Sequence, residues 1–225
     1  METVVLSLGG SLIVPDEVDF DYLKKFRRVI EKFVVNGFRF VIVCGGGKTA
    51  RDYQRAAKKI VNLHPEDVDW LGVHATRINA HLLRTVFRDK AHPKIITNPI
   101  EKINFKEKIL VAAGWKPGWS SDYDAVLLAK NLGVKKVINL SNIDYVYDKD
   151  PKKFKDAKRF DSISWHDFRK VVGDEWDPGL NLPFDPVASK EAEKEGLTVI
   201  IANGADLDNF EVILRGKRFN GTTIH

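Results

Sequence analysis

With 225 residues, 44% of them hydrophobic and 30% charged, the chain is long enough for one well-buried domain and has an ordinary globular composition. No apolar run approaches the roughly 20 residues of a membrane span, and the sequence enters a strand at once instead of a secretory leader, so we expect a cytoplasmic protein without a membrane partner. The net charge of +5 comes from basic residues dispersed among acids, which argues against a nucleic-acid partner.

Apolar runs alternate with helical patterns along the whole chain, which is typical of an α/β protein with a mostly parallel sheet. In the first half we expect a strand at 3–8, a helix from about 19 to 37, a strand at 38–44, a helix to about 59, a longer helix at about 66–89, and strands at 94–97 and 108–113. The apolar stripe of the first helix is Phe20, Leu23, Phe26, Ile30, Phe33 and Val34. The single cysteine, Cys44, ends an apolar run, so we expect a core residue and no internal disulfide.

The second half continues the alternation. We expect a helix at about 121–133, a strand at 136–140, helices near 165–172 and 184–195, a strand at 197–202, and a terminal stretch to 224 with no assigned element. An acidic loop at 142–151 and a long, mobile loop at 173–186 separate these elements. Because no linker, repeat or low-complexity segment divides the chain, residues 1–225 should form a single domain.

Two glycine turns carry the strongest chemical signal. The apolar run that ends at Cys44 is followed by Gly-Gly-Gly-Lys at 45–48 and then by a helical pattern, and the first strand is followed by Gly-Gly-Ser at 9–11. Glycines let the backbone approach a ligand closely, and the free N–H groups at a helix start favour phosphate. The two turns therefore predict a protein that handles phosphoryl groups.

Three other interpretations of these glycines were weighed. A P-loop needs a further glycine where Ile42 stands, so the match is partial. Gly45, Gly47 and Ala50 fit a loose dinucleotide pattern, but the acidic residue expected about 20 positions later falls in turn and helix-start chemistry. A tight turn without a ligand is the third interpretation.

Acidic residues and histidines outside these turns have plainer explanations. Asp122 and Asp124 lie in the first turn of a predicted helix, where a capping role alone would explain them. His74 and His81 are seven residues apart, which is not the spacing of a zinc pair, so no metal-binding residue is predicted.

Five segments in order resemble the amino acid kinase family, and within it the archaeal-type uridylate (UMP) kinases. They are Ser-Leu-Gly-Gly-Ser at 7–11, Gly-Gly-Gly-Lys-Thr-Ala-Arg at 45–51, Asp-Trp-Leu-Gly with Ala-Thr-Arg-Ile-Asn-Ala at 69–80, Pro-Gly-Trp-Ser-Ser-Asp at 117–122, and Asn-Ile-Asp-Tyr-Val-Tyr-Asp-Lys-Asp-Pro at 142–151. The resemblance implies a three-layer αβα sandwich that transfers the γ-phosphoryl group of ATP, with Mg²⁺, to UMP. It also implies an N-terminal acceptor part, an ATP-binding part at roughly 120–225, and a homohexamer.

The same resemblance implies roles for individual residues. The ATP-binding set is Gly9, Gly10, Ser11, Gly47, Arg51, Ser141, Asn142, Tyr147 and Asp150. The UMP-binding set is Gly46, Asp69, Trp115, Lys116, Pro117, Gly118, Trp119, Ser120 and Ser121. The catalytic candidates are Arg51, Lys48 and Asp185, and Asp185 could equally be a helix cap.

The chain departs from the family pattern at three places. The lysine that many relatives carry before the first glycine turn is absent, since Leu6, Ser7 and Leu8 occupy that stretch, and Lys48 or Lys190 could supply the cation. The acceptor loop carries two tryptophans, which stack on a ligand or pack at a subunit interface. Tyr145 replaces the usual glycine. These departures keep open another small phosphate or acid as the acceptor, or a non-catalytic nucleotide-binding protein.

Overall fold

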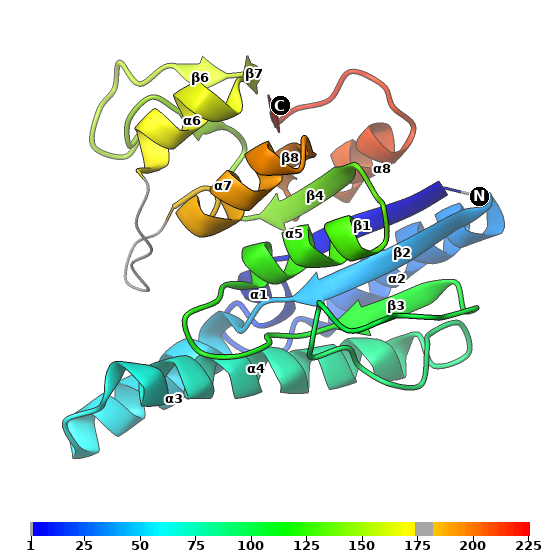
Figure 1. The fold of residues 1–225 in the computed structure, drawn as a ribbon, viewed down its shortest axis with the longest axis horizontal. Coiled ribbons are helices and arrows are strands. Elements are labelled where there is room, and N and C mark those ends of the chain that lie inside the picture. The colour runs from blue at the N-terminus through cyan, green and yellow to red at the C-terminus, as the bar shows by residue number, and fades with distance from the viewer. Residues whose placement is uncertain (1, 174–181) are drawn as a thin grey trace.

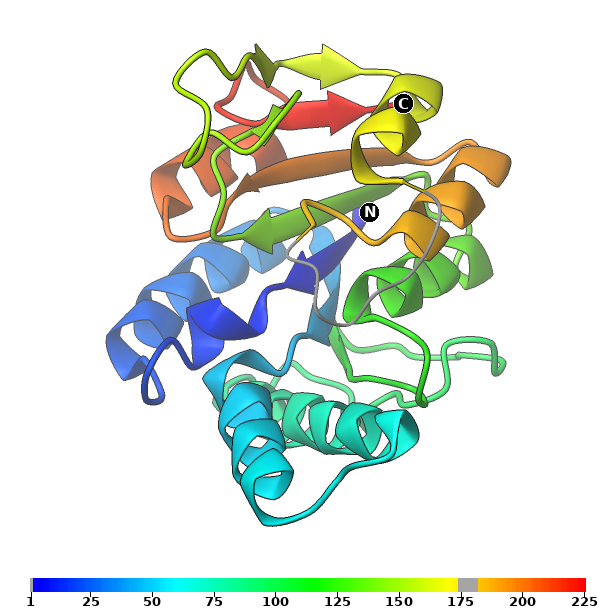
Figure 2. The same cartoon turned by 90° about the vertical axis from the view of Figure 1, so that its left-hand side faces the viewer.

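A seven-stranded, mostly parallel sheet forms the centre of the molecule (Figures 1 and 2). The computed structural model describes residues 2–173 and 182–225. In spatial order the strands are β3 (Ile109–Ala112), β2 (Phe38–Cys44), β1 (Glu2–Leu8), β4 (Lys136–Ser141), β8 (Thr198–Asn203), β9 (Thr222–Ile224) and β7 (Ser162–Ile163). Only the β8–β9 pair is antiparallel. A small hairpin, β5 (Val146–Tyr147) with β6 (Arg159–Phe160), lies beside the sheet.

Alternation along the buried strands sends side chains to both faces of this sheet, and each face has its own core. On β1, Leu6 and Leu8 enter one core, whereas Val5 enters the other. The first core is covered by α1 (Gly10–Ile13), α2 (Phe20–Val35), α4 (Pro65–Val86) and α8 (Leu207–Leu214). The second is covered by α5 (Ser121–Asn131), α6 (Trp165–Val172) and α7 (Pro186–Lys194). The predicted three-layer sandwich is confirmed.

Helix α3 (Gly47–Ile60) stands apart from both layers, because it packs along α4 and buries none of its residues (Figure 1). Cys44, at the end of the strand before it, is fully buried in the first core as expected. No helix in the described residues is long and apolar enough to cross a membrane.

Helix α2 shows how local signals fix an element. Asp19 caps it by accepting the Tyr22 amide at 2.8 Å, and Gly37 follows its end with a φ of 91°. The predicted stripe is buried with one exception: Phe20 is 71% exposed. Phe20 is the first residue of the helix, before any complete turn packs on the sheet, so the stripe prediction is wrong there.

The predicted strand at 94–97 is not a regular strand. The segment runs beside β3 but pairs with it only at two isolated bridges, Ala91 with Ile109 and Ile96 with Ala112. Between these two bridges the segment advances five residues, from 91 to 96, while β3 advances three, from 109 to 112. Pro93, within the segment, also has no N–H to donate. A continuous ladder cannot form with that mismatch.

The C-terminal region contains two elements that the sequence analysis left unassigned. Helix α8 begins after Asp206, whose side chain accepts the Asn209 amide at 2.9 Å, and β9 inserts between β8 and β7. Most of the predicted loop at 173–186 is residues 174–181, which lie outside the described part of the chain.

The direction in which successive strands are added to the sheet reverses between β1 and β4, although these two strands are parallel. From β1 the chain adds β2 and β3 on one side, and it then returns to place β4 and β8 on the other. Ligands of such sheets bind outside the carboxyl ends of the strands at this switch point. Both glycine turns follow strands of this central group, so the site is expected there.

Candidate active site

The two glycine turns lie against each other at the carboxyl ends of β1 and β2. A Cβ atom on Gly10 would lie 2.0 Å from the backbone nitrogen of Gly47, and one on Gly47 would lie 2.2 Å from the carbonyl oxygen of Gly10. Gly47 also has a φ of 64°, which other residues rarely adopt. Close contact of two backbones therefore explains part of the glycine run that the sequence analysis assigned to an anion.

Three amides of these turns have no protein acceptor in the described part of the chain. Among residues 2–173 and 182–225, no protein group accepts a hydrogen bond from the amides of Gly10, Gly46 or Gly47. Asn79 on α4 is 3% exposed and donates to the carbonyl oxygens of Gly45 and Gly46, at 2.8 and 3.1 Å, so the carbonyls are already paired. Backbone amides without a protein acceptor at a glycine turn are suited to an anion.

Asp122 turns toward the sheet at the switch point. Its Oδ1 accepts the hydroxyl of Ser7 on β1 at 2.9 Å and the side-chain amide of Asn139 on β4 at 3.3 Å. Desolvation, with the nearby charge of Asp185, raises the pKa of Asp122 to about 7. A capping role alone does not explain Asp122, because its carboxylate joins the two central strands to α5.

Asp124 also points inward instead of capping the helix. The cap of α5 is Ser120, whose hydroxyl accepts the Tyr123 amide at 3.1 Å. Asp124 is 1% exposed, and its Oδ2 accepts the backbone N–H of Trp115 at 3.1 Å. Burial is the main reason that the pKa of Asp124 is raised to about 7, while Arg77 opposes the rise. The capping explanation fails here too.

Asp185 caps α7, as one of the two interpretations of this residue expected. Its Oδ1 accepts the amide of Ala188 at 2.6 Å, and the side chain is almost fully buried. Burial raises the pKa of Asp185, and hydrogen bonds from Ala188 and Ser120 oppose the rise. Asp122, Asp124 and Asp185 thus form a carboxyl cluster between α5 and α7.

The predicted acceptor loop, residues 114–120, is fixed to α4 near its start. Thr76 accepts the Gly114 amide at 2.7 Å, and Arg77 donates to the carbonyl oxygens of Gly114 and Trp115 at 3.3 and 2.9 Å. Thr76 and Arg77 belong to one of the family motifs, at 69–80. Their side-chain role could not be found from it, because the contacts span nearly 40 residues of chain.

Asp69 fixes the same loop further along. Its Oδ2 accepts the Gly118 amide at 2.8 Å, and among the described residues Oδ1 has no protein partner. Gly118 has a φ of 80°, so the loop turns there. Asp69, which is predicted to bind UMP, is thus joined to the predicted acceptor loop, and its Oδ1 has no partner among the described residues.

The two loop tryptophans contact each other within the protomer as a tilted pair. The ring centroids of Trp115 and Trp119 are 5.9 Å apart, and Trp119 stacks on Tyr123 at 4.4 Å. The ammonium of Lys116 lies 4.2 Å from the Trp115 ring centroid. These contacts lower the cost of placing two large rings in a surface loop, although both tryptophans remain only partly buried.

Two of the predicted cations, Lys48 and Arg51, lie in the first half of α3. The ammonium of Lys48 contacts the Asp52 carboxylate, one helical turn away, at 2.6 Å. Arg51 is exposed on the same helix, whereas Lys190 is exposed on α7. Lys48 is therefore engaged with its own helix in this structure.

The predicted donor residues lie at the end of β4 and on the hairpin. Ser141 is the last residue of β4, and Asn142 follows it. Tyr147 belongs to β5, and Asp150 forms a turn by accepting the Lys152 amide at 2.9 Å.

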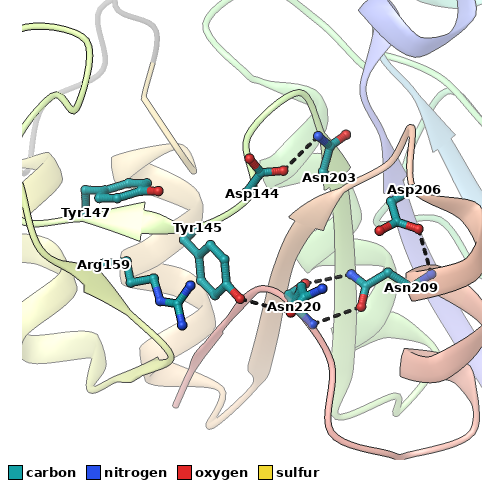
Figure 3. Close-up of a pocket in the computed structure, with 8 residues that line it drawn as sticks. All are labelled: Asp144, Tyr145, Tyr147, Arg159, Asn203, Asp206, Asn209 and Asn220. Atoms are coloured by element: carbon teal, nitrogen blue, oxygen red, sulfur yellow. Dashed lines mark hydrogen bonds between the residues drawn. The ribbon is translucent and has the colours of Figure 1, made fainter.

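A polar pocket of about 380 Å³ opens beside these residues (Figure 3). Its lining residues are Asp144, Tyr145, Tyr147, Arg159, Asn203, Asp206, Asn209 and Asn220. The hydroxyl of Tyr145 donates to Asn220 at 3.2 Å, and the Arg159 guanidinium lies 4.4 Å from the Tyr145 ring centroid. Of the predicted donor residues, only Tyr147 is among those that line this pocket. The other lining residues could not be predicted without the tertiary structure, although the bulk of Tyr145 was visible in the sequence.

Fold and site together define an α/β protein that can bind phosphorylated ligands at the switch point of its sheet. Residues 2–203 match the amino acid kinase family, and the chain belongs to that family. It is 35% identical to the uridylate kinase of Thermoplasma volcanium, over 96% of this chain and 94% of the relative, and 34% identical to that of Pyrococcus abyssi, over 98% of both. The crystal structure of uridylate kinase from Archaeoglobus fulgidus superposes over the full length of both chains with a TM-score of 0.83 at 30% identity.

Proposed function

We propose that this chain is a UMP kinase that catalyses ATP + UMP → ADP + UDP. The near-full-length similarity to uridylate kinases supports the reaction. The observation that carries the proposal is the meeting of two glycine turns at the switch point, with amides that have no acceptor among the described residues, because a phosphoryl-transfer site must bring two phosphate groups together.

The residue roles that we propose follow this division. The acceptor UMP would bind at Gly46, at Asp69 through its open Oδ1, and along 115–121, where Ser120 and Ser121 offer hydroxyls. The donor ATP would bind at the turn 9–11 and Gly47, with Ser141, Asn142, Tyr147 and Asp150 around its nucleoside. Arg51 would hold phosphate oxygens with its forked guanidinium.

Catalysis would rest on positioning and charge neutralisation, without a covalent intermediate. Lys48 is the cation nearest to the turns in sequence, and it would have to exchange Asp52 for a phosphate oxygen. Asp122 would keep the strand ends in register, since it joins Ser7 and Asn139 across the transfer zone. Asp185 would stabilise the start of α7 beside it.

ATP would bring Mg²⁺ with it. The described residues contain no group of three or more His, Cys, Asp or Glu side chains that could hold a metal ion, so the nucleotide phosphates would supply most of the ligands. The ion would neutralise the charge of the donor phosphates. No side chain is assigned as its ligand.

We further propose a homo-oligomer, a hexamer as in the family resemblance. Helix α3 buries no residue in the protomer and exposes Tyr53 at 65% and Ile60 at 79%, which is the surface that a second copy would cover. A cytoplasmic role in pyrimidine nucleotide synthesis follows from the proposed reaction.

Release of ADP, coupled to a detection enzyme, tests the proposal with ATP-Mg²⁺ and a panel of UMP, CMP, AMP, dUMP and isopentenyl phosphate. Turnover with UMP above the other acceptors is the expected result. Turnover only with another acceptor would favour the second candidate, a same-fold kinase, for which the contact between Trp115 and Trp119 in the acceptor loop is the motivating observation. Binding of ATP without turnover of any acceptor would contradict both.

A further inference from the structure

We propose that Asp124 is a positioning residue that sets the affinity for the acceptor, by holding the acceptor loop through the backbone of Trp115. The inference rests on the proposed function, because it takes residues 114–120 as the acceptor loop. Nothing in the sequence resemblance assigns a role to this carboxyl, and it touches neither glycine turn.

The Trp115 residue is held from two helices at once. Its N–H donates to Asp124 on α5 at 3.1 Å, and its carbonyl oxygen accepts from Arg77 on α4 at 2.9 Å. Both polar groups of one residue are therefore fixed by charged side chains of opposite sign. Such charge-assisted hydrogen bonds are stronger than neutral ones. The direction in which the loop leaves β3 is thereby defined.

The burial of Asp124 indicates that stability alone does not explain this residue. The side chain is 1% exposed, and its Oδ1 has no hydrogen-bond partner among the described residues. Its neighbours Ala125 and Val126 are fully buried apolar residues. Burial of a half-satisfied carboxyl is unfavourable, and an apolar side chain of the same shape would pack at this position at lower cost. The gain from Asp124 must therefore lie in what its Oδ2 holds.

Several charges act on this carboxyl. Arg77 of α4 favours its ionised form, whereas Asp122 on α5 and Asp185 at the start of α7 disfavour it. Ionisation strengthens acceptance of the Trp115 N–H. Acceptor affinity should therefore rise as Asp124 loses its proton, and an amide at this position should remove that part of the pH dependence.

Two variants separate positioning from packing. Asp124→Val places a short apolar side chain at this position and removes the acceptor oxygen, and Asp124→Asn keeps an acceptor oxygen without the charge. The matched control is Tyr22→Phe on α2, which also removes a buried oxygen without a partner but lies away from the loop. Calorimetric titrations with UMP and with a non-hydrolysable ATP analogue at pH 8 give the dissociation constants, and thermal unfolding gives the stability.

We expect Asp124→Val to weaken UMP binding about tenfold, as expected for one lost charge-assisted hydrogen bond, with ATP-analogue binding unchanged and the midpoint of thermal unfolding unchanged or raised. Asp124→Asn should stay within about threefold of the parent, with UMP affinity that rises less between pH 6 and 8 than it does in the parent. Tyr22→Phe should leave both affinities unchanged. A folded Asp124→Val variant with parental UMP affinity would overturn the proposal, and so would equal weakening of both ligands.

A second readout keeps this test separate from the proposed reaction. Amide hydrogen exchange of the segment 113–119 should accelerate in Asp124→Val without any ligand, and remain near the parental rate in Asp124→Asn. If the parent protein binds no UMP, the proposed function fails. Amide hydrogen exchange of 113–119 then remains as the test of the contact between Asp124 and the Trp115 N–H. Unchanged exchange in Asp124→Val would overturn it.

Discussion

The proposed acceptor half and the proposed donor half of the site are held in place by different means. The acceptor loop is tied by charged side chains of two helices, Arg77 and Asp69 from α4 and Asp124 from α5. The donor hairpin is tied instead to the last strand: Thr222 accepts the amide of Val146, and Asn220 accepts the Tyr145 hydroxyl. Acceptor geometry should therefore respond to charge and pH, whereas donor geometry should respond to the packing of the C-terminal strand.

The largest effect is expected where the two halves touch. Gly10→Ala would place a Cβ atom 2.0 Å from the Gly47 nitrogen, so both turns must move apart. We expect kcat/KM to fall by more than about 100-fold, with both ligands bound more weakly. Gly133→Ala is the control, because Gly133 has a φ of 66° with open space around its Cα. It should lose about 1 kcal/mol of stability without loss of affinity. Equal kinetics of Gly10→Ala and the parent would show that the turns do not meet as described.

A smaller effect, on one half only, is expected from Arg77→Ala. This change removes two hydrogen bonds from the acceptor loop, so UMP should bind about 30-fold more weakly while the ATP analogue binds as before. Titration calorimetry measures both. Arg39→Ala is matched, since Arg39 also donates to two backbone carbonyls, at 2.6 and 3.2 Å, in a different loop. An equal loss of UMP affinity in that control would exclude a specific role for Arg77.

The converse change is Thr222→Val on β9. It leaves the buried amide of Val146 and the carbonyl of Phe160 without their partner, which should cost about 1–3 kcal/mol in the free energy of unfolding. ATP-analogue affinity should fall about fivefold as the hairpin loosens, with UMP affinity retained. Urea unfolding and calorimetry test the two parts, and weaker UMP binding with unchanged ATP binding would reverse the comparison.

The carboxyl cluster predicts how stability depends on pH. Asp122 and Asp124 have pKa values raised to about 7 from an ordinary value of 3.8, so between about pH 4 and 7 the folded chain retains protons that the unfolded chain has released. The free energy of unfolding should therefore fall as the pH rises through this window, by about 1 kcal/mol or more. Asp124→Asn should reduce the fall. Urea unfolding at pH 5 and 8 measures it, and a rise in stability across the window would refute the assignment.

The smallest effect belongs to the rim of the donor pocket. Tyr145→Phe removes one partly exposed hydrogen bond, to Asn220, but keeps the ring under Arg159. ATP-analogue affinity, measured by titration calorimetry, should fall only about twofold. Tyr145→Gly, by contrast, removes the ring as well and should change affinity more. If both variants bind the analogue like the parent, this pocket does not contact the donor.

Sequence patterns predicted the elements that local chemistry determines. Helix α6 and strand β2 have the expected bounds, because their signals are local. For the helix these are an N-cap and a period of 3.6 residues, and for the strand it is a short, continuous apolar run. The failures are non-local. Asp124 reads as a first-turn acid, but α5 is buried on nearly all sides, so no solvent face exists for it to occupy. The two-residue strands β5 and β7 depend on their partners, because β5 pairs with β6 and β7 pairs with β9.

The candidate site was predictable in outline for the same reason. Both glycine turns can be recognised from residue type alone. The hydrogen bonds that hold the acceptor loop join residues far apart in the chain, such as Asp69 with Gly118 and Arg77 with Trp115. A single sequence carries no signal for such pairs.

The insertion of β9 between β8 and β7 also sets an order of events during synthesis. Strand β7 joins the described sheet through β9, and the hairpin is tied to Asn220 and Thr222, so neither can settle until residues 220–224 have left the ribosome. Strands β1 to β4, by contrast, can pair as soon as residue 141 is available. A nascent chain would thus acquire its acceptor half long before its donor half.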